Sequence, residues 1–195
     1  QVTGDLVLLG DVLVTTGLGV GDDFSVSGTT TGAFDLTAAA GLGNVDLTGA
    51  VSGLDVLTVT SAAQTTLGST ASANDIDLTS TTVRFTANVT ALLDDVQVTG
   101  DLVLLGDVLV TTGLLAGDDF SVSGTTTGAF DLTVVAGLGN AAQSSAFSAH
   151  ENGAKVLVIE KAPVAKKGGN TWFSASAHLR HYHRGLIDER PLLPN

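Results

Sequence analysis

The sequence predicts a mainly β fold, a repetitive β-solenoid of the parallel β-helix type, followed by a short α/β segment at the C-terminal end. Three observations support this fold class. Residues 1–44 and 97–140 align without gaps and differ at only four positions. Short runs of alternating apolar and polar residues recur along residues 1–140, with Gly, Asn or Ser between them. Residues 141–195 have a different composition and contain all four His and all three Pro.

The spacing of the two copies defines a repeat unit of 96 residues, whose second copy starts at Gln97. Near-identical units stack on one another in solenoids and bury a continuous core. We therefore assign residues 1–140 to the solenoid. Gln1 is itself the first residue of a unit, so we expect the chain to belong to a longer array. The four positions that differ are Gly19/Leu115, Val20/Ala116, Ala38/Val134 and Ala39/Val135.

Within the unit, an Asp often opens an alternating run, as in Asp11-Val-Leu-Val-Thr and Asp46-Leu-Thr, and such runs recur about every ten to twelve residues. Alternation with a period of two residues is typical of strands, and the β-branched residues in these runs pack well on a pleated surface. The many glycines disfavour helices. We expect Val, Leu and Phe to fill the interior and Thr, Ser and Asp to face water. A β-sandwich is the alternative arrangement of so many short strands.

Charge divides the chain in the same place as composition. Residues 1–140 contain 16 Asp, no Glu and a single basic residue, Arg84, whereas residues 141–195 contain seven Lys or Arg and four Asp or Glu. The net charge of −12 disfavours binding to nucleic acid. The absence of Cys excludes disulfides and cysteine nucleophiles. The most apolar stretch, residues 102–116, is interrupted by Asp107 and is too short to span a membrane, so we expect no membrane span.

Residues 1–140 combine GDV and GDD openings with LTVT and TTTGAFDLT runs and Ala/Gly turns. In these features they resemble the β-helical repeats of filamentous-haemagglutinin-type bacterial adhesins. The resemblance implies a structural protein that is extracellular or displayed on the bacterial cell surface, as an adhesin-like stalk or a filament subunit without catalytic activity. It also implies self-association into a longer array or filament, and a ligand on a host or another surface. It assigns no catalytic or binding residue.

Paired carboxylates occur at Asp22-Asp23, Asp94-Asp95 and Asp118-Asp119. Ca²⁺ takes several oxygen ligands, so these pairs are candidate calcium sites. The alternative is that they are solvated turn carboxylates, which keep the array soluble and discourage pairing at sheet edges. On that alternative, which we favour, the repeat region holds no metal and no cofactor.

Residues 141–195, together with residues 132–140, predict a partial Rossmann-like βαβ unit. The expected order is a strand (132–136), a glycine-rich turn (Gly137, Gly139), a helix (141–152), a strand (155–159) and Glu160. In dinucleotide-binding folds such glycines let the backbone approach a pyrophosphate, and the acidic residue accepts hydrogen bonds from the ribose hydroxyls. The sequence AGLGN also occurs at residues 40–44, so this turn belongs to the repeat pattern as well.

The stretches GNAAQSSAFSAHENGAKVLVIEKAP and KKGGNTWFSASA resemble the N-terminal FAD-binding segment of flavoprotein dehydrogenases of the fumarate reductase/tricarballylate dehydrogenase type. The resemblance covers residues 131–195 and implies FAD as the cofactor, oxidoreductase activity and a cytoplasmic location. The second functional hypothesis is therefore a partial or chimeric FAD-dependent dehydrogenase. The FAD contacts that the resemblance implies are Gly137, Gly139, Glu160, Gly168, Gly169, Asn170 and Thr171.

Overall fold

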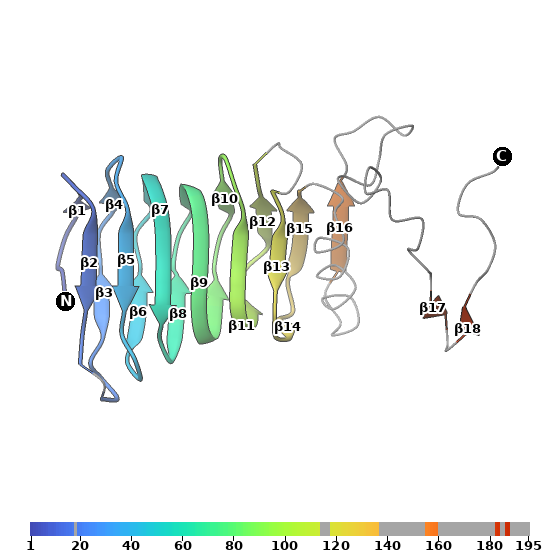
Figure 1. Ribbon diagram of the computed structural model, residues 1–195, viewed down its shortest axis with the longest axis horizontal. Coiled ribbons are helices and arrows are strands. Elements are labelled where there is room, and N and C mark those ends of the chain that lie inside the picture. Colours follow the sequence, from blue (N-terminus) through green and yellow to red (C-terminus); the bar gives the residue numbers. More distant parts are fainter. Residues whose placement is uncertain (18, 114–117, 137–154, 160–181, 184–185, 188–195) are drawn as a thin grey trace.

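The structure of the protein is a computed structural model. It describes residues 1–17, 19–113 and 118–136, and the backbone of residues 155–159, 182–183 and 186–187. All regular structure in these residues is β-strand, and the strands form a parallel β-solenoid of about six turns. Successive coils follow one another along the long axis of the molecule (Figure 1). The predicted β-solenoid is confirmed.

Each coil contributes to three parallel ladders of strands, which we name faces A, B and C. Face A contains β1 (Leu6–Val7), β4 (Thr30–Thr31), β10 (Val89–Ala91), β12 (Val108–Thr111), β15 (Asp131–Val135) and β16 (Lys155–Ile159). Face B contains β2 (Val12–Thr15), β5 (Leu36–Ala39) and β13 (Phe120–Val122). Face C contains β3 (Phe24–Val26), β6 (Asn44–Leu47), β8 (Gln64–Leu67) and β14 (Thr126–Thr127).

Three longer strands continue from one face to the next. β7 (Val51–Ser61) belongs to faces A and B, and β11 (Val96–Leu104) belongs to faces B and C. β9 (Ala71–Phe85) contributes to all three faces. Apart from the solenoid, β17 (Tyr182–His183) and β18 (Leu186–Ile187) pair antiparallel in a sheet of their own.

The core is a continuous column of aliphatic side chains with single aromatic rings. On face B the register aligns buried residues of successive coils: Leu36, Leu57, Ile76, Val96 and Phe120. Like therefore stacks on like, as the repeat predicts, and each coil buries its apolar residues against the coils on either side. At about 25 cal/mol per Å² of apolar surface, this burial is the main favourable term for the fold.

The two copies of the repeat lie on different faces. Leu6 is on face A, whereas its equivalent Leu102 is on face C. Counted along face A, Val89 lies four coils after Leu6. From Val89 the chain continues through face B and reaches face C at Leu102. One unit is therefore not a whole number of turns, and each copy is rotated by one face relative to the other. Because the inward and outward alternation is the same on each face, the same sequence folds in either setting.

The strands depart from the predicted pattern in one respect. Asp11 and Asp23 directly precede β2 and β3, as expected. Asp46, which was expected to open a run, lies inside β6 at an outward position between buried neighbours, and Asp77 has the same placement inside β9. The strand alternation explains this difference, because an outward position inside a strand accepts Asp as readily as a turn does.

The expected helix at residues 141–152 lies outside the described residues. Of the predicted βαβ unit, the described residues are the two strands, β15 and β16, which pair in parallel from Asp131 with Lys155 to Val135 with Ile159. Among the described residues no helix has the length and apolar character needed to cross a membrane.

Candidate functional site

Aspartates tie successive coils together. In six pairs, a carboxylate oxygen accepts a hydrogen bond from the backbone N–H of a residue one coil further along the chain. We call these bonds the inter-coil Asp caps. They join Asp5 to Thr29 (2.7 Å), Asp11 to Asp35 (3.2 Å), Asp23 to Asn44 (2.7 Å), Asp95 to Asp119 (2.5 Å), Asp101 to Thr125 (2.8 Å) and Asp107 to Asp131 (3.0 Å).

The caps lie at the starts of strands. The donor N–H belongs either to the residue just before a strand, as in Thr29, or to the first residue of the strand, as in Asn44 and Asp131. A short carboxylate side chain from the preceding coil satisfies this N–H group. The pKa of Asp5 and the pKa of Asp101 are both lowered, first by the hydrogen bond from the backbone of Thr29 or Thr125 and then by that from its side chain. Six of the 16 aspartates in residues 1–140 thus have a structural role, because they hold neighbouring coils together.

Each of the three acidic pairs that were candidate calcium sites takes part in hydrogen bonds, but these bonds are of different kinds. The carboxylates of Asp23 and Asp95 form inter-coil Asp caps. Asp22 accepts a hydrogen bond from the N–H of Gly19 at 2.8 Å. The backbone carbonyl of Asp118 accepts one from the Thr112 hydroxyl at 2.7 Å. In the described part of the chain, no group of three or more His, Asp or Glu side chains could hold a metal ion.

A row of carboxylates runs along the corner that precedes face B. We call it the Asp row, and its members are Asp11, Asp35, Asp75, Asp95 and Asp119, which directly precede paired residues of face B. In the coil between Asp35 and Asp75 the equivalent position is held by Val56, and Asp55 lies one residue before it. Burial, followed by the negative charges of Asp77, Asp94 and Asp95, raises the pKa of Asp75 to about 6 against the opposing hydrogen bond from the backbone of Ile76. Asp75 therefore binds a proton in a range where an ordinary Asp is fully ionised.

Two further carboxylates near Asp75 are perturbed in the same direction. Burial, followed by the charges of Asp95 and Asp94, raises the pKa of Asp77. Burial, followed by the charges of Asp95 and Asp118, raises the pKa of Asp119, one of whose oxygens is buried without a hydrogen-bond partner. Like charges gather here because Asp75, Asp95 and Asp119 precede paired residues in adjacent coils, so that their carboxylates and those of their neighbours repel one another when ionised.

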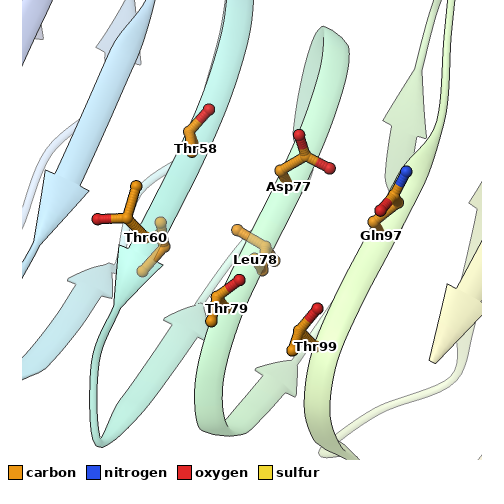
Figure 2. A pocket seen from close by; sticks show the side chains of 8 residues that line it. Thr58, Thr60, Asp77, Leu78, Thr79, Gln97 and Thr99 are labelled. Carbon is orange, nitrogen blue, oxygen red and sulfur yellow. The ribbon is translucent and has the colours of Figure 1, made fainter. Parts of the chain in front are cut away.

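An open hollow lies on face B beside the Asp row. Its wall is a polar ladder on three adjacent strands, in which Thr58 of β7, Asp77 of β9 and Gln97 of β11 are in register. Figure 2 shows these side chains side by side, with Thr79 and Thr99 next to them on the same strands. Thr60, Val59 and Leu78 complete the lining.

The hollow offers hydroxyl, carboxamide and carboxylate groups to a ligand. The amide nitrogen of Gln97 donates to the Asp95 carboxylate at 3.1 Å, which fixes the orientation of the amide. Hydroxyl and carboxamide groups both donate and accept hydrogen bonds, so the lining can bond to either donors or acceptors of a polar molecule. The lining residues from Thr58 to Thr79 belong to the first unit, and Gln97 and Thr99 belong to the second.

The FAD contacts implied by the sequence resemblance, from Gly137 to Thr171, lie outside the described residues. The parallel pairing of β15 with β16 is compatible with a βαβ unit. It also has the 24-residue spacing with which β2 pairs with β5 and β12 pairs with β15, so β16 continues the ladder of face A with the spacing of a solenoid coil.

Sequence reasoning missed the inter-coil Asp caps. The signal for them was present, because Asp11 precedes Asp35 by 24 residues, and this spacing recurs in the second copy between Asp107 and Asp131. The polar ladder had no such signal, because it depends on spacings of about 20 residues that differ from coil to coil.

Comparison of the chain with protein-family models, curated proteins and solved structures returned no match.

Proposed function

We propose that the chain is a structural, surface-exposed repeat protein, an adhesin-like stalk or filament subunit that has no catalytic activity of its own. The observation that carries this proposal is the placement of one sequence on different faces. Leu8 and Leu104 are both buried, and the caps of Asp5 and Asp101 are both made, although each equivalent pair lies on two different faces. A unit that needs only its neighbouring coils can be repeated to set a length, which is what a stalk requires.

The polar hollow on face B gives this proposal a place for a surface ligand. Its hydroxyl, amide and carboxylate groups favour a carbohydrate over an apolar ligand. On the proposal, Asp77→Asn and Gln97→Ala weaken glycan binding by the full chain in an array measurement, whereas Asp46→Asn, on face C, leaves binding unchanged. Equal binding by all three variants would contradict the assignment of the ligand to this hollow.

Small-angle X-ray scattering and a flavin absorbance spectrum of the purified full chain test the structural proposal. We expect an elongated particle whose cross-section matches one coil, and no bound flavin before or after incubation with FAD. Stoichiometric flavin, or reduction of that flavin by a dicarboxylate or tricarboxylate substrate, would contradict a purely structural role.

Stoichiometric bound flavin would favour the second candidate, a partial or chimeric FAD-dependent dehydrogenase. The parallel pairing of β15 with β16 is the observation in its favour, because a βαβ unit requires two parallel strands next to one another. Under this candidate, Glu160→Ala and Gly139→Ala both reduce flavin binding. Loss of flavin in these two variants, with the same thermal unfolding midpoint as the parent chain, would support it over the stalk.

A further inference from the structure

The hollow on face B has one charged side chain in its lining, the carboxylate of Asp77 in β9. Asp77 lies on the central strand of the hollow, in register with Thr58 of β7 on one side and Gln97 of β11 on the other (Figure 2). The volume of the hollow, about 370 Å³, falls in the size range of pockets that bind small molecules. A ligand in this hollow therefore meets a carboxylate at its centre.

The carboxylate of Asp77 is not used by the fold in the way that the neighbouring carboxylate is. Asp95 accepts hydrogen bonds from the N–H of Asp119 and from the side-chain amide of Gln97. Asp77 accepts none from the residues that the structure describes. A partly buried carboxylate without donors gains most from a ligand that brings both N–H groups and a positive charge, because hydrogen bonds between charged groups are the strong ones.

The surroundings of Asp77 add negative charge and no positive charge. The charges of Asp95 and Asp94, after burial, raise the pKa of Asp77. Arg84 is the only basic residue within residues 1–140, and it lies on face C, where it pairs with Val103. The described residues therefore supply no counter-charge at the hollow, and a cation placed against Asp77 would reduce the repulsion among these carboxylates.

The rest of the lining matches the hydroxyl groups of a ligand. Thr79 and Thr99 follow Asp77 and Gln97 by two residues on the same strands, so they form a second outward row beside the first. Adjacent strands lie about 4.8 Å apart, so the two rows repeat hydrogen-bonding groups at that interval along the solenoid axis. Such an array contacts a molecule with hydroxyls along its length at several points, whereas a simple amine would contact Asp77 alone.

We propose that the hollow on face B binds a glycan that carries a protonated amine, such as a 2-amino sugar without an acetyl group, with its ammonium group against Asp77 and its hydroxyls along the two polar rows. The proposal rests on the surface-ligand role proposed above and names the chemical class of that ligand. It orders glycans by charge. Amino sugars bind most tightly, neutral sugars bind less tightly, and sugars with carboxylate or sulfate groups are repelled.

Calorimetric titration of the full chain with two matched oligosaccharides tests the proposal. One is a short β-linked oligomer of glucosamine, and the other is the same oligomer with every amine acetylated. We expect the glucosamine oligomer to bind about tenfold more tightly at low salt and near neutral pH, because its ammonium group forms a charge-assisted hydrogen bond with a carboxylate. This preference should shrink as added salt screens the charges.

Three variants locate the preference. Asp77→Asn keeps the size of the side chain and removes its charge, so it should reduce the preference about tenfold. Gln97→Lys places an ammonium group on the adjacent strand in register with Asp77, where it competes with the amine of the ligand and should also remove the preference. Asp46→Asn, on face C, is the matched control, because it changes the net charge equally and should keep the preference.

Equal binding of the two oligomers by the parent chain would overturn the proposal and leave the hollow as a site for neutral glycans. A preference that persists in Asp77→Asn, or that falls equally in Asp46→Asn, would overturn it as well, because the overall negative charge of the chain would then account for the effect. Failure to bind either oligomer would overturn it together with the assignment of a ligand to this hollow. The scattering and flavin measurements depend on none of these results, so failure of this inference is distinguishable from failure of the structural function.

Discussion

Asp101 and Thr125 lie one coil apart, and the carboxylate of Asp101 accepts two hydrogen bonds from Thr125, from its backbone N–H at 2.8 Å and from its hydroxyl at 2.9 Å. One unit earlier, Asp5 accepts from the N–H of Thr29 at 2.7 Å. The two caps lie at different corners of the solenoid, yet they have the same geometry. The cap is therefore a property of the local sequence, and it holds neighbouring coils together wherever that sequence falls.

Removal of one cap should destabilise the solenoid. Asp101→Ala leaves the Thr125 N–H without its acceptor, and we expect the thermal unfolding midpoint at neutral pH to fall by a few degrees. Asp101→Asn keeps an oxygen acceptor in the same place and should lose less. Thermal unfolding followed by far-ultraviolet circular dichroism measures the midpoints of both variants. An unchanged midpoint in Asp101→Ala would mean that water replaces the carboxylate at no cost.

The contribution of this cap also depends on pH. The folded-state pKa of Asp101 lies below the ordinary value of 3.8 because the hydrogen bonds favour the charged form. A lowered folded-state pKa means that the stabilisation is present above the unfolded-state pKa and is lost as the pH falls through the folded-state value. The difference between the parent chain and Asp101→Ala should therefore shrink in acid below about pH 3.8.

The contribution of Asp75 to stability depends on pH in the opposite direction. Its folded-state pKa is raised from 3.8 to about 6, so the folded chain binds a proton more tightly than the unfolded chain does. Stability associated with this group is present at low pH and is lost as the pH rises through that interval. We expect Asp75→Asn to raise the unfolding midpoint at neutral pH and to flatten its pH dependence between about 4 and 6.

Asp46→Asn is the matched control for Asp75→Asn, because Asp46 is also an outward Asp inside a strand but lies on face C, away from the Asp row. It removes one negative charge without relieving the crowded corner. If both variants stabilise the chain equally at neutral pH, net charge and not the local environment of Asp75 is responsible.

Much of the architecture follows from the sequence. The alternation of apolar and polar residues in runs such as Val12–Thr15 determines which side chains face inward, and the long repeat indicates stacking. The number of faces and the rotation of the second copy cannot be predicted from the sequence. Partners in adjacent coils are 24 residues apart for Leu6 and Thr30 but 19 apart for Leu57 and Ile76, because the turns differ in length. Period-two alternation carries no information about where a coil closes.

The candidate site, too, is only partly predictable from the sequence. Each Asp of the row is visible in the sequence, but the raised pKa of Asp75 comes first from burial and then from the charges of Asp77, Asp94 and Asp95, and both the burial and the last two charges depend on how the coils stack. Likewise, Thr58 and Gln97 are 39 residues apart and meet across Asp77 only because β7, β9 and β11 are adjacent in register. Contacts between coils can be read from a sequence once the coil length is known, and not before.

The repeat offers an internal comparison of core burial. Leu102 is fully buried, whereas the identical residue Leu6 in β1 is partly buried. We expect Leu102→Ala to reduce the free energy of unfolding by about 2–5 kcal/mol, as for other buried leucines, and Leu6→Ala to cost less than half of that. Chemical denaturation of the two variants measures the difference. Equal losses would show that Leu6 is covered in solution.

Two equivalent glycines test whether the turns obey the same rule on different faces. Gly32 and Gly128 have φ values of +138° and +141°, a region that favours glycine. A Cβ at Gly32 would lie 2.6 Å from the carbonyl oxygen of Leu8, and one at Gly128 would lie 2.7 Å from that of Leu104. In each case the obstacle is the backbone of the preceding coil, which cannot move without separating the ladders.

Gly32→Ala and Gly128→Ala should therefore each destabilise the chain by about 1–3 kcal/mol, the usual cost of a strained backbone position. Gly10→Ala is the control, because a Cβ there meets no atom within 4 Å, and we expect a change within about 0.5 kcal/mol. Urea denaturation monitored by far-ultraviolet circular dichroism measures the free energy of unfolding of all three variants. Similar losses at Gly32 and Gly128 would show that the coil beneath sets the turn on either face. A neutral result at one of them would mean that its turn can relax out of the left-handed region, and that the two faces are not equivalent.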